Sequence, residues 1–525
     1  MQQVESNQFT YHTRFYVDAS SQAVLGAYAS LMSCIERKLF ADICKGKKHQ
    51  NLKSTYITEF GITARQFNSI RIGLEGKIDS VKNLRKTRII ELGHQIAALK
   101  ERIPKIKKAE QANKIHQKKR RLFNLQRKLD QLKQDEASGT VRICFGSKKL
   151  FRAQFSLAEN GYSSHEEWKK NWEYKRNNAF FLIGSKDESS GNQSCTATVA
   201  EDGSITLRLR LPQALVGAYG KYLYITNVRF GYGHDVIVAN ILKCITKGEK
   251  AGVAINYRFQ RDEKGWRVFV TTPYTPPECI THTDRGVIGV DINSDHIAIT
   301  ETDRFGNLIN SKSIPLVCYG KTTNETKALV GDVAKEIVNQ ACAAQKPIVM
   351  EKLDFQKKKM TLRETRSTKF SRMLSSLAYS TIIAALKSRS LRFGVEVYEV
   401  NPAYTSIIGR VNYAARYGLT IHAAAALIIA RRAIGLSERL PRHQGKIPDG
   451  KGGYVTLSLP VRNRDKHVWS SWRQVLRQFQ VVLAAHFQAK KKILKPVQTC
   501  LCDGASPLNL VGAIPTHESL VKLLD

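Results

Sequence analysis

Acidic residues are scarce in this chain of 525 residues, which contains 45 aspartates and glutamates against 83 lysines and arginines. The formal net charge is therefore +38 at neutral pH. A field of this sign attracts polyanions, and each phosphate that a lysine or arginine neutralises releases condensed counterions. The composition therefore indicates nucleic acid as the leading partner, although charge alone says nothing about chemistry.

Long apolar runs are also missing. No window approaches ~18 uncharged apolar residues, so no transmembrane helix and no membrane partner are expected. The first residues, MQQVESNQFTYHTRF, lack a basic region followed by an apolar stretch, which predicts no secretory signal. The ten cysteines are scattered, which is typical of a reducing compartment. We therefore expect a cytoplasmic, nucleoid-associated protein.

Cysteine pairs with the spacing of a zinc ribbon are absent as well. The nearest approach is Cys500-Leu501-Cys502, and a lone CxC pair cannot supply the four ligands of a structural zinc site. The sequence therefore predicts no structural zinc.

The N-terminal half shows a strand pattern interrupted by helical sequence. Alternating residues predict strands at 8–18 and 140–151, and hairpins that turn near Asp202-Gly203 and Lys264-Gly265. Residues 1–20 and 138–275 are therefore expected to form a small β-barrel, into which residues 21–137 are inserted as helices.

Residues 82–133 within this insertion are strongly basic and keep a narrow apolar seam. The seam residues recur at helical spacing: Ile89, Leu92, Ile96, Leu99, Leu122, Leu125, Leu129 and Leu132. Pro104 should separate two helices of a hairpin. The cationic run Lys118, Lys119, Arg120 and Arg121 is the candidate clamp on a nucleic-acid backbone, and the alternative is a solvated charged hairpin.

After a proline-containing linker at residues 272–286 the pattern becomes α/β. Three antiparallel strands with tight turns are expected first, followed by a helix near 326–344, the buried strand PIVME, a helix near 369–393, the strand VEVYEVNP and a helix near 420–434. This order predicts an RNase H-like domain at residues 286–436. Residues 437–525 form a basic C-terminal extension, and the whole chain is expected to be a multidomain α/β protein.

Two carboxylates end apolar strands in this domain. Asp291 follows Val287-Ile288-Gly289-Val290, and Glu351 follows Pro347-Ile348-Val349-Met350. A carboxylate at such a position pays a desolvation cost unless a cation neutralises it. If the two strands are neighbours, both carboxylates can bind Mg²⁺ or Mn²⁺ for phosphodiester cleavage.

These segments resemble the motifs of a known family. VIGVDINSDHIAITETDRFGN and KPIVMEKLDFQKKK are similar to the first and second RuvC motifs of TnpB-like (OrfB) proteins, and the VNPAYTS segment and HAAAALIIARRAIG resemble the third-motif region. These transposon-encoded proteins are related to miniature type V CRISPR effectors. The resemblance covers residues 286–436. It implies a RuvC-type domain, a wedge-type barrel with a helical recognition insert, and RNA-guided DNA cleavage.

The third motif departs from this family, because His422 stands where an aspartate is usual. An imidazole can bind a metal or move a proton, but it is a softer ligand than magnesium prefers. The third ligand of the site is therefore expected to be His422, to be Asp465, or to be absent. Asp291, Glu351 and His422 are the candidate catalytic and metal-binding residues.

Further cations and aromatic residues are candidates for nucleic-acid contacts. Lys357, Lys358 and Lys359 follow the second motif and could hold phosphates of the scissile strand, or they are simply solvated. In the extension, Trp469 and Trp472 are interleaved with basic residues, which suits either a groove for single strands or a helix core.

Together these features predict an RNA-guided, metal-dependent DNA endonuclease, acting as a monomer or homodimer on double-stranded and single-stranded DNA with a guide RNA. Two alternatives remain: an RNA-guided DNA-binding protein with an impaired nuclease, and a transposase-like DNA strand transferase.

Overall fold

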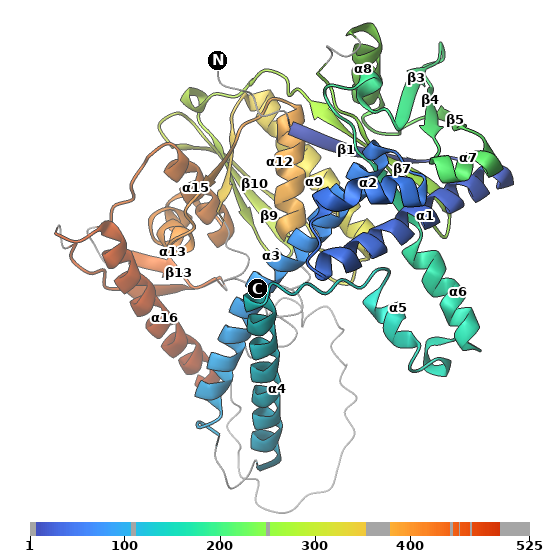
Figure 1. Cartoon of the computed structure of the whole chain (residues 1–525). Helices are drawn as coiled ribbons and strands as arrows, with labels where there is room; N and C mark the ends of the chain where they lie inside the picture. Colours follow the sequence, from blue (N-terminus) through green and yellow to red (C-terminus); the bar gives the residue numbers. More distant parts are fainter. Residues whose placement is uncertain are drawn as a thin grey trace, which may run out of the picture. The chain divides into compact units, whose positions relative to one another are not determined.

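The computed structural model describes residues 7–106, 112–247, 252–352, 379–441, 445–450, 452–462 and 465–493. The chain divides into two compact units, Met1–Thr275 and Pro276–Asp525. Each unit has its own helices and strands (Figure 1) and its own hydrophobic core.

The first unit contains helices around two antiparallel sheets. Its helices are α1 (Ala19–Cys44), α2 (His49–Phe60), α3 (Ala64–Arg102), α4 (Ala112–Ala137), α5 (Lys148–Ala153), α6 (His165–Arg176), α7 (Gln213–Tyr219) and α8 (His234–Lys247). Its strands are β1 (Asn7–Arg14), β2 (Ala179–Leu182), β3 (Cys195–Val199), β4 (Ile205–Arg210), β5 (Tyr222–Val228), β6 (Asn256–Asp262) and β7 (Gly265–Tyr274).

The strands do not close into the barrel that the sequence predicts. In the described residues they form one sheet of order β1-β7-β6-β2 and a separate sheet of order β3-β4-β5. Both expected hairpins are present, β3–β4 and β6–β7. The N-terminal strand β1 pairs with β7, and a bidentate ion pair from Arg14 to Asp262 fixes its end. The arginine holds the pKa of the Asp262 carboxyl well below its usual range.

The prediction of a strand at residues 140–151 is also wrong. Residues 140–147 are irregular, and α5 begins at Lys148 with Ser147 as its N-cap. The alternation itself is preserved, since Val141, Ile143 and Phe145 are half-buried and Arg142 and Cys144 are exposed. The segment packs one side against the core but pairs with no described strand.

Helices α3 and α4 form the predicted basic hairpin. The seam positions Leu92, Ile96 and Leu99 of α3 are buried. The seam positions of α4, such as Leu122 and Leu125, are only half-buried. This 3–4 spacing is the pattern of two helices packed along a narrow stripe. Buried Arg85 fastens the base of the hairpin by donating to the backbone oxygens of Asp135 and Thr140.

The second unit is built on a mixed five-stranded sheet. Its strands are β8 (Ile288–Ile292), β9 (His296–Thr302), β10 (Leu308–Pro315), β11 (Ile348–Glu351) and β12 (Val397–Val400), in the order β10-β9-β8-β11-β12. Strands β8, β9 and β10 are consecutive antiparallel neighbours, as predicted, whereas β11 lies parallel to both β8 and β12. The carboxyl ends of β8, β11 and β12 therefore meet at one edge of the sheet.

Each face of this sheet is covered by helix. Helices α9 (Thr323–Ala344) and α12 (Tyr379–Arg392) pack on the face formed by Ile288, Val290 and Met350 (Figure 1). Helix α15 (Ile421–Ala433) covers the opposite face, against Val287 and Val349. Alternation along β8 and β11 therefore turns Asp291 and Glu351 toward the α15 side.

Small residues allow α15 to approach the sheet closely. A Cβ added at Gly289 would lie 2.1 Å from the carbonyl oxygen of Ala426. Residues Ala423–Ala430 of α15 are all buried, and Thr300 Oγ1 donates to the Ala423 oxygen at 2.9 Å.

The remaining elements follow β12 and α15. They are α13 (Thr405–Gly409), a π-helical turn (Arg410–Ala414), α14 (Ala415–Tyr417), β13 (Gly445–Pro448), β14 (Tyr454–Leu457) and α16 (Val468–Ile493). Trp472 of α16 is buried in a core of its own with Ile447 and Phe479, so the core interpretation is correct for this tryptophan.

No single helix in the described ranges is long and apolar enough to span a membrane. Among the described residues, only the helical segments Thr405–Tyr417 and Ile421–Ala433 taken together are long and apolar enough, and they are bent by 110° relative to each other.

Candidate active site

Asp291 lies in β8 with its side chain 14% exposed. Its Oδ2 accepts a hydrogen bond from Asn293 Nδ2 at 3.1 Å and lies 3.3 Å from His422 Nδ1. Both contacts engage the same oxygen, so the carboxylate is held in one orientation by neutral or cationic groups. The strand's apolar neighbours exclude water from the opposite face of the sheet.

Glu351 occupies the neighbouring position on the adjacent parallel strand. The paired residues Ile348–Ile288, Val349–Gly289 and Met350–Val290 are all 60 positions apart (348 − 288), and so are Glu351 and Asp291 (351 − 291). Adjacent strands lie about 4.8 Å apart, and residues in register point to the same face. The two predicted carboxylates therefore each follow directly after the last pair of this ladder, Met350–Val290, near the carboxyl edge of the sheet.

His422 reaches this edge from the first turn of α15. Thr420 caps that helix, since its hydroxyl accepts from the amide of Ala423 at 3.1 Å. The His422 ring also meets the ring of His296 edge to face, with centroids 4.9 Å apart, and His296 Nδ1 lies 2.7 Å from Asp295 Oδ1. The structure therefore brings His422 to Asp291.

Thr405 contacts the second carboxylate. Its hydroxyl donates to Glu351 Oε1 at 2.6 Å, and its side chain is buried. The preceding residue, Tyr404, has φ of +63°, a left-handed conformation that costs a non-glycine residue about 1–3 kcal/mol. Arg432 of α15 braces this turn by donating to the carbonyl oxygens of Asn401 and Ala403.

Tyr379, at the start of α12, interacts electrostatically with Asp291 and Glu351. Burial, together with the negative charges of Asp291 and Glu351, raises the pKa of its phenol to about 12. The Tyr379 hydroxyl donates to the Ile292 oxygen at 3.4 Å. The phenol is therefore neutral at physiological pH and lies within the electrostatic range of both carboxylates.

Three or more histidine, cysteine, aspartate or glutamate side chains gathered to hold a metal ion are not found among the described residues. Asp465, the other candidate for third ligand, is exposed in the loop before α16. Lys357, Lys358 and Lys359 lie outside the described residues, as do Cys500 and Cys502.

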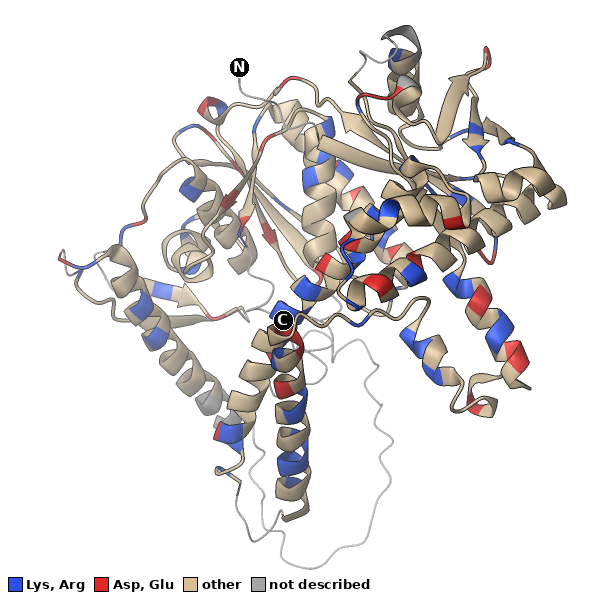
Figure 2. Cartoon of the chain, viewed as in Figure 1, with Lys and Arg blue, Asp and Glu red and all other residues tan. Residues whose placement is uncertain are grey.

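The predicted clamp residues lie on α4 in the first unit. Lys119, Arg120 and Arg121 are exposed and Lys118 is half-buried. Lysine and arginine dominate the N-terminal part of this helix (Figure 2), whereas its acids, Asp130, Asp135 and Glu136, lie toward the C-terminal end. One cationic stretch is thus presented to solvent.

The sequence reasoning missed Thr405 and Tyr379. A threonine after VNPAY carries no pattern that predicts a bond to a residue 54 positions earlier. Tyr379 begins a helix whose face toward the sheet cannot be known before the sheet order is known.

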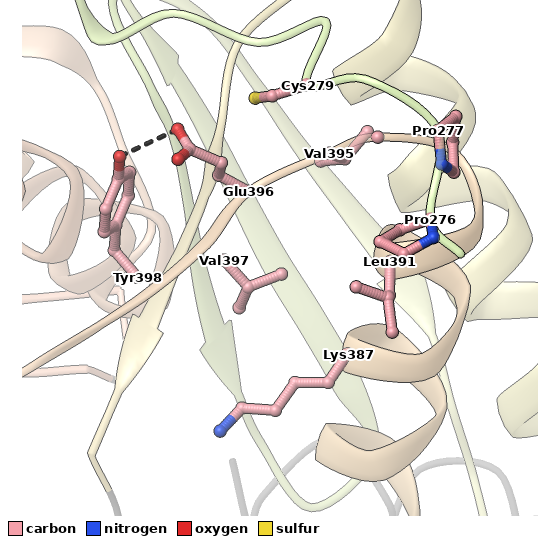
Figure 3. A pocket seen from close by; sticks show the side chains of 10 residues that line it. Pro276, Pro277, Cys279, Lys387, Leu391, Val395, Glu396, Val397 and Tyr398 are labelled. Carbon is pink, nitrogen blue, oxygen red and sulfur yellow. Dashed lines mark hydrogen bonds between the residues drawn. The ribbon is translucent and has the colours of Figure 1, made fainter. Parts of the chain in front are cut away.

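A cavity of about 510 Å³ in the second unit lies apart from these residues (Figure 3). It follows the edge strand β12 and the end of α12, and its lining includes Cys279, Lys387, Leu391 and Tyr398 but none of the predicted site residues. The Tyr398 hydroxyl donates to Glu396 at 2.8 Å, which raises the pKa of Tyr398 to about 12.

Comparison with known proteins gives partial overlaps. No family model and no curated protein matches the chain. Among solved structures, a Cas12f1–sgRNA–target DNA complex is 10% identical over 53% of this chain and 77% of that chain, with a TM-score of 0.21. A Cas12i–crRNA–dsDNA complex is 11% identical over 68% of this chain and 60% of that chain, with a TM-score of 0.29.

A CRISPR–Cas12f ternary complex is 12% identical over 83% of this chain and all of that chain, with a TM-score of 0.19. Overlaps of this extent do not establish a common fold.

Proposed function

We propose that this chain is an RNA-guided DNA endonuclease, in which Asp291 and Glu351 of an RNase H-like domain bind a divalent cation for phosphodiester hydrolysis. The observation that carries the proposal is the register of β8 and β11, which pairs Met350 with Val290, the residues directly before Glu351 and Asp291. Continued in that register, both side chains would point to the same face of the sheet. The strand order, with three antiparallel strands followed by two parallel ones, supports the same domain assignment.

The donor set fits a hard cation. Mg²⁺ is commonly bound by one or two carboxylates together with waters and substrate phosphates, so a pair of acids is sufficient. Asp291 and Glu351 would hold it, and His422 or Asp465 would complete the set if a third ligand is needed. A bound cation of this kind lowers the pKa of water and stabilises the leaving oxygen.

The chain's own residues orient the acids. Asn293 and His422 fix Oδ2 of Asp291, and Thr405 fixes Oε1 of Glu351. Pre-orientation of this kind matters because a charged ligand that must reorganise loses binding free energy. His422 is 46% exposed, so its imidazole can also exchange a proton with solvent beside the reacting phosphate.

The basic surface supports the guided part of the proposal. Base pairing between a guide RNA and the target strand would read sequence, while the protein would read backbone shape and a short flanking motif. The net charge of +38 and the cationic stretch on α4 suit the backbone contacts that this division of labour requires.

The test is cleavage of a plasmid by purified ribonucleoprotein, assembled on RNA transcribed from DNA that flanks the gene, with Mg²⁺ or Mn²⁺. Asp291→Asn and Glu351→Gln should each abolish cleavage while guided binding persists. Asp332→Asn is the matched control, because Asp332 is an exposed carboxylate on α9 and should leave cleavage unchanged. Cleavage that persists in both Asp291→Asn and Glu351→Gln would refute the proposal.

The second candidate is a guided DNA-binding protein with an impaired nuclease. It is favoured by His422, whose imidazole contacts Asp291 where a third acid would otherwise contribute negative charge. Tight guided binding with intact plasmid would establish this reading, whereas joined DNA products would indicate a strand transferase.

A further inference from the structure

A cavity of the first unit combines cations with exposed aromatic rings. It has a volume of about 600 Å³, within the range of about 300–1,000 Å³ that is usual for small-molecule sites. We call it the Trp172 pocket. It is formed by α1, the irregular segment 142–145, α5 and α6, and α5 and α6 pack against each other (Figure 1).

Five cationic side chains and no acidic one line the Trp172 pocket. The cations are Arg37, Arg142, Lys148, Arg152 and Arg176. Among the described residues only two of these have an acidic partner, since Arg142 pairs with Asp135 at 3.1 Å and Arg176 with Glu173 at 3.5 Å. The pocket therefore presents a concentrated positive charge.

The positive charges of Arg37 and Arg176 repel each other. Arg37 Nη1 donates to the neutral oxygens of Ser33 and Asn177, at 2.8 and 3.0 Å. Burial and then the nearby Arg176 lower the pKa of Arg37. The Nε of Arg176 is buried and has no hydrogen-bond partner among the described residues. An anion in the pocket would relieve the like-charge repulsion between Arg37 and Arg176.

The aromatic wall of the pocket consists of Trp172, which is held in place by its neighbours, and of Phe151 and Phe155, which are exposed. Trp172 stacks on Trp168 with centroids 5.9 Å apart and planes at 14°, and Trp168 Nε1 donates to the Leu150 oxygen at 2.8 Å. Phe151 and Phe155 are 43% and 76% exposed. Exposed phenylalanines beside unpaired cations are unfavourable in water and suit a flat, anionic ligand.

A glycine keeps the backbone close to this wall. Gly146 has φ of +95°, and a Cβ there would lie 3.0 Å from the indole of Trp172. Only glycine adopts this conformation without strain and leaves the indole in its place.

We propose that the Trp172 pocket binds one nucleotide of a single-stranded nucleic acid, with the base stacked on the aromatic wall and the phosphate held by the cations. The proposal rests on the proposed function for the presence of a nucleic-acid partner, and it adds a binding site outside the nuclease domain. An acidic peptide would satisfy the charge but would leave the flat ring surfaces without a planar partner.

The test uses short fluorescent oligomers and the full chain carrying Asp291→Asn, so that nothing is cleaved. One oligomer is oligouridylate, one is oligodeoxythymidylate, and one is an abasic oligomer of the same length, which keeps the phosphates and lacks the bases. The unchanged pocket should bind either base-containing oligomer more tightly than the abasic one, and the tighter of the two identifies RNA or DNA as the source.

Phe155→Ala should weaken binding of the base-containing oligomers by about tenfold and leave the abasic oligomer unaffected. Phe123→Ala is the control, because Phe123 is a similarly exposed phenylalanine on α4. Lys148→Gln should weaken all three oligomers more than Lys149→Gln, its exposed neighbour that does not line the pocket.

Equal affinity of the unchanged pocket for base-containing and abasic oligomers would overturn the proposal, as would equal effects of Phe155→Ala and Phe123→Ala. Displacement of the abasic oligomer alone by polyglutamate, without any base preference, would indicate an acidic peptide site and also overturn it. Because binding is scored without cleavage, failure of the nuclease proposal leaves this result interpretable, and failure here leaves the plasmid test intact.

Discussion

At the scale of single residues, the contact between Thr405 and Glu351 is the most informative. The hydroxyl of Thr405 has one proton, and the Pro402 oxygen at 3.2 Å competes with Glu351 Oε1 at 2.6 Å for it. The strained Tyr404 and the brace from Arg432 hold the threonine where the carboxylate is the nearer acceptor. Thr405 is therefore a positioning residue for a proposed catalytic acid.

We expect Thr405→Val to lower the cleavage rate about tenfold, because loss of a hydrogen bond to a metal-binding carboxylate typically costs about 10–100-fold in metal affinity or activity. Thr405→Ser keeps the hydroxyl and should restore most of the rate. Rates measured over a series of Mg²⁺ concentrations check this, and an unchanged metal dependence in Thr405→Val would contradict it.

At the scale of elements, the distance between α15 and β8 is set by Gly289. The alanines of α15 and this glycine allow the helix backbone to lie almost directly on the strand. His422 and Asp291 meet because of that close approach, so the site depends on the packing of Gly289, two residues before Asp291 in β8.

Gly289→Ala should lower the free energy of unfolding by about 1–3 kcal/mol, because the new methyl group overlaps the Ala426 oxygen and α15 must move away. Cleavage should fall with it, since His422 moves with the helix. Gly331→Ala is the control: Gly331 lies inside α9 with open space around it, and alanine there should stabilise by about 0.5–1 kcal/mol. Urea unfolding of both variants measures the difference, and equal midpoints would show that the sheet and α15 are not in close contact.

The α4 clamp is tested by its salt dependence. Replacing Lys119, Arg120 and Arg121 by glutamine should weaken RNA binding and lower the slope of log K against log salt by about two to three, one phosphate contact for each charge. The same replacement at the exposed residues Lys321, Lys327 and Lys335 removes equal charge from the second unit and should change the slope less. Equal slopes in the two triple variants would indicate that the α3–α4 hairpin is a solvated charged hairpin that does not bind the nucleic-acid backbone.

At the scale of the whole molecule, the net charge of +38 opposes compaction. Like charges separated by more than about 8 Å are largely screened at physiological ionic strength, but they repel one another strongly in dilute buffer. The free energy of unfolding of the free protein should therefore be lowest where salt and nucleic acid are both scarce.

The melting temperature should consequently rise as sodium chloride is increased from low concentration to about 0.15 M. Scanning calorimetry measures this, and the triple glutamine variant of α4, with less charge to screen, should show a smaller rise. A melting temperature that falls with salt in this range would mean that attractive ion pairs such as Arg14–Asp262 outweigh the repulsion.

Much of the secondary structure could be predicted because its signals are local. Period-two alternation and turn residues predicted both hairpins of the first unit and the three antiparallel strands of the second. Apolar residues at helical spacing predicted the seam between α3 and α4. The same local signal misled at 140–151, where the alternation is real but no partner strand follows it.

The sequence by itself determined which side chains face the core and that Asp291 and Glu351 each follow a run of apolar strand residues, since these properties depend only on the pattern along the chain. The tertiary structure decided which strands are neighbours. Pairing is a long-range choice, and it alone places β11 beside β8 and brings Thr405 to Glu351 and His422 to Asp291. It also leaves the described strands of the N-terminal half as two open sheets rather than a barrel.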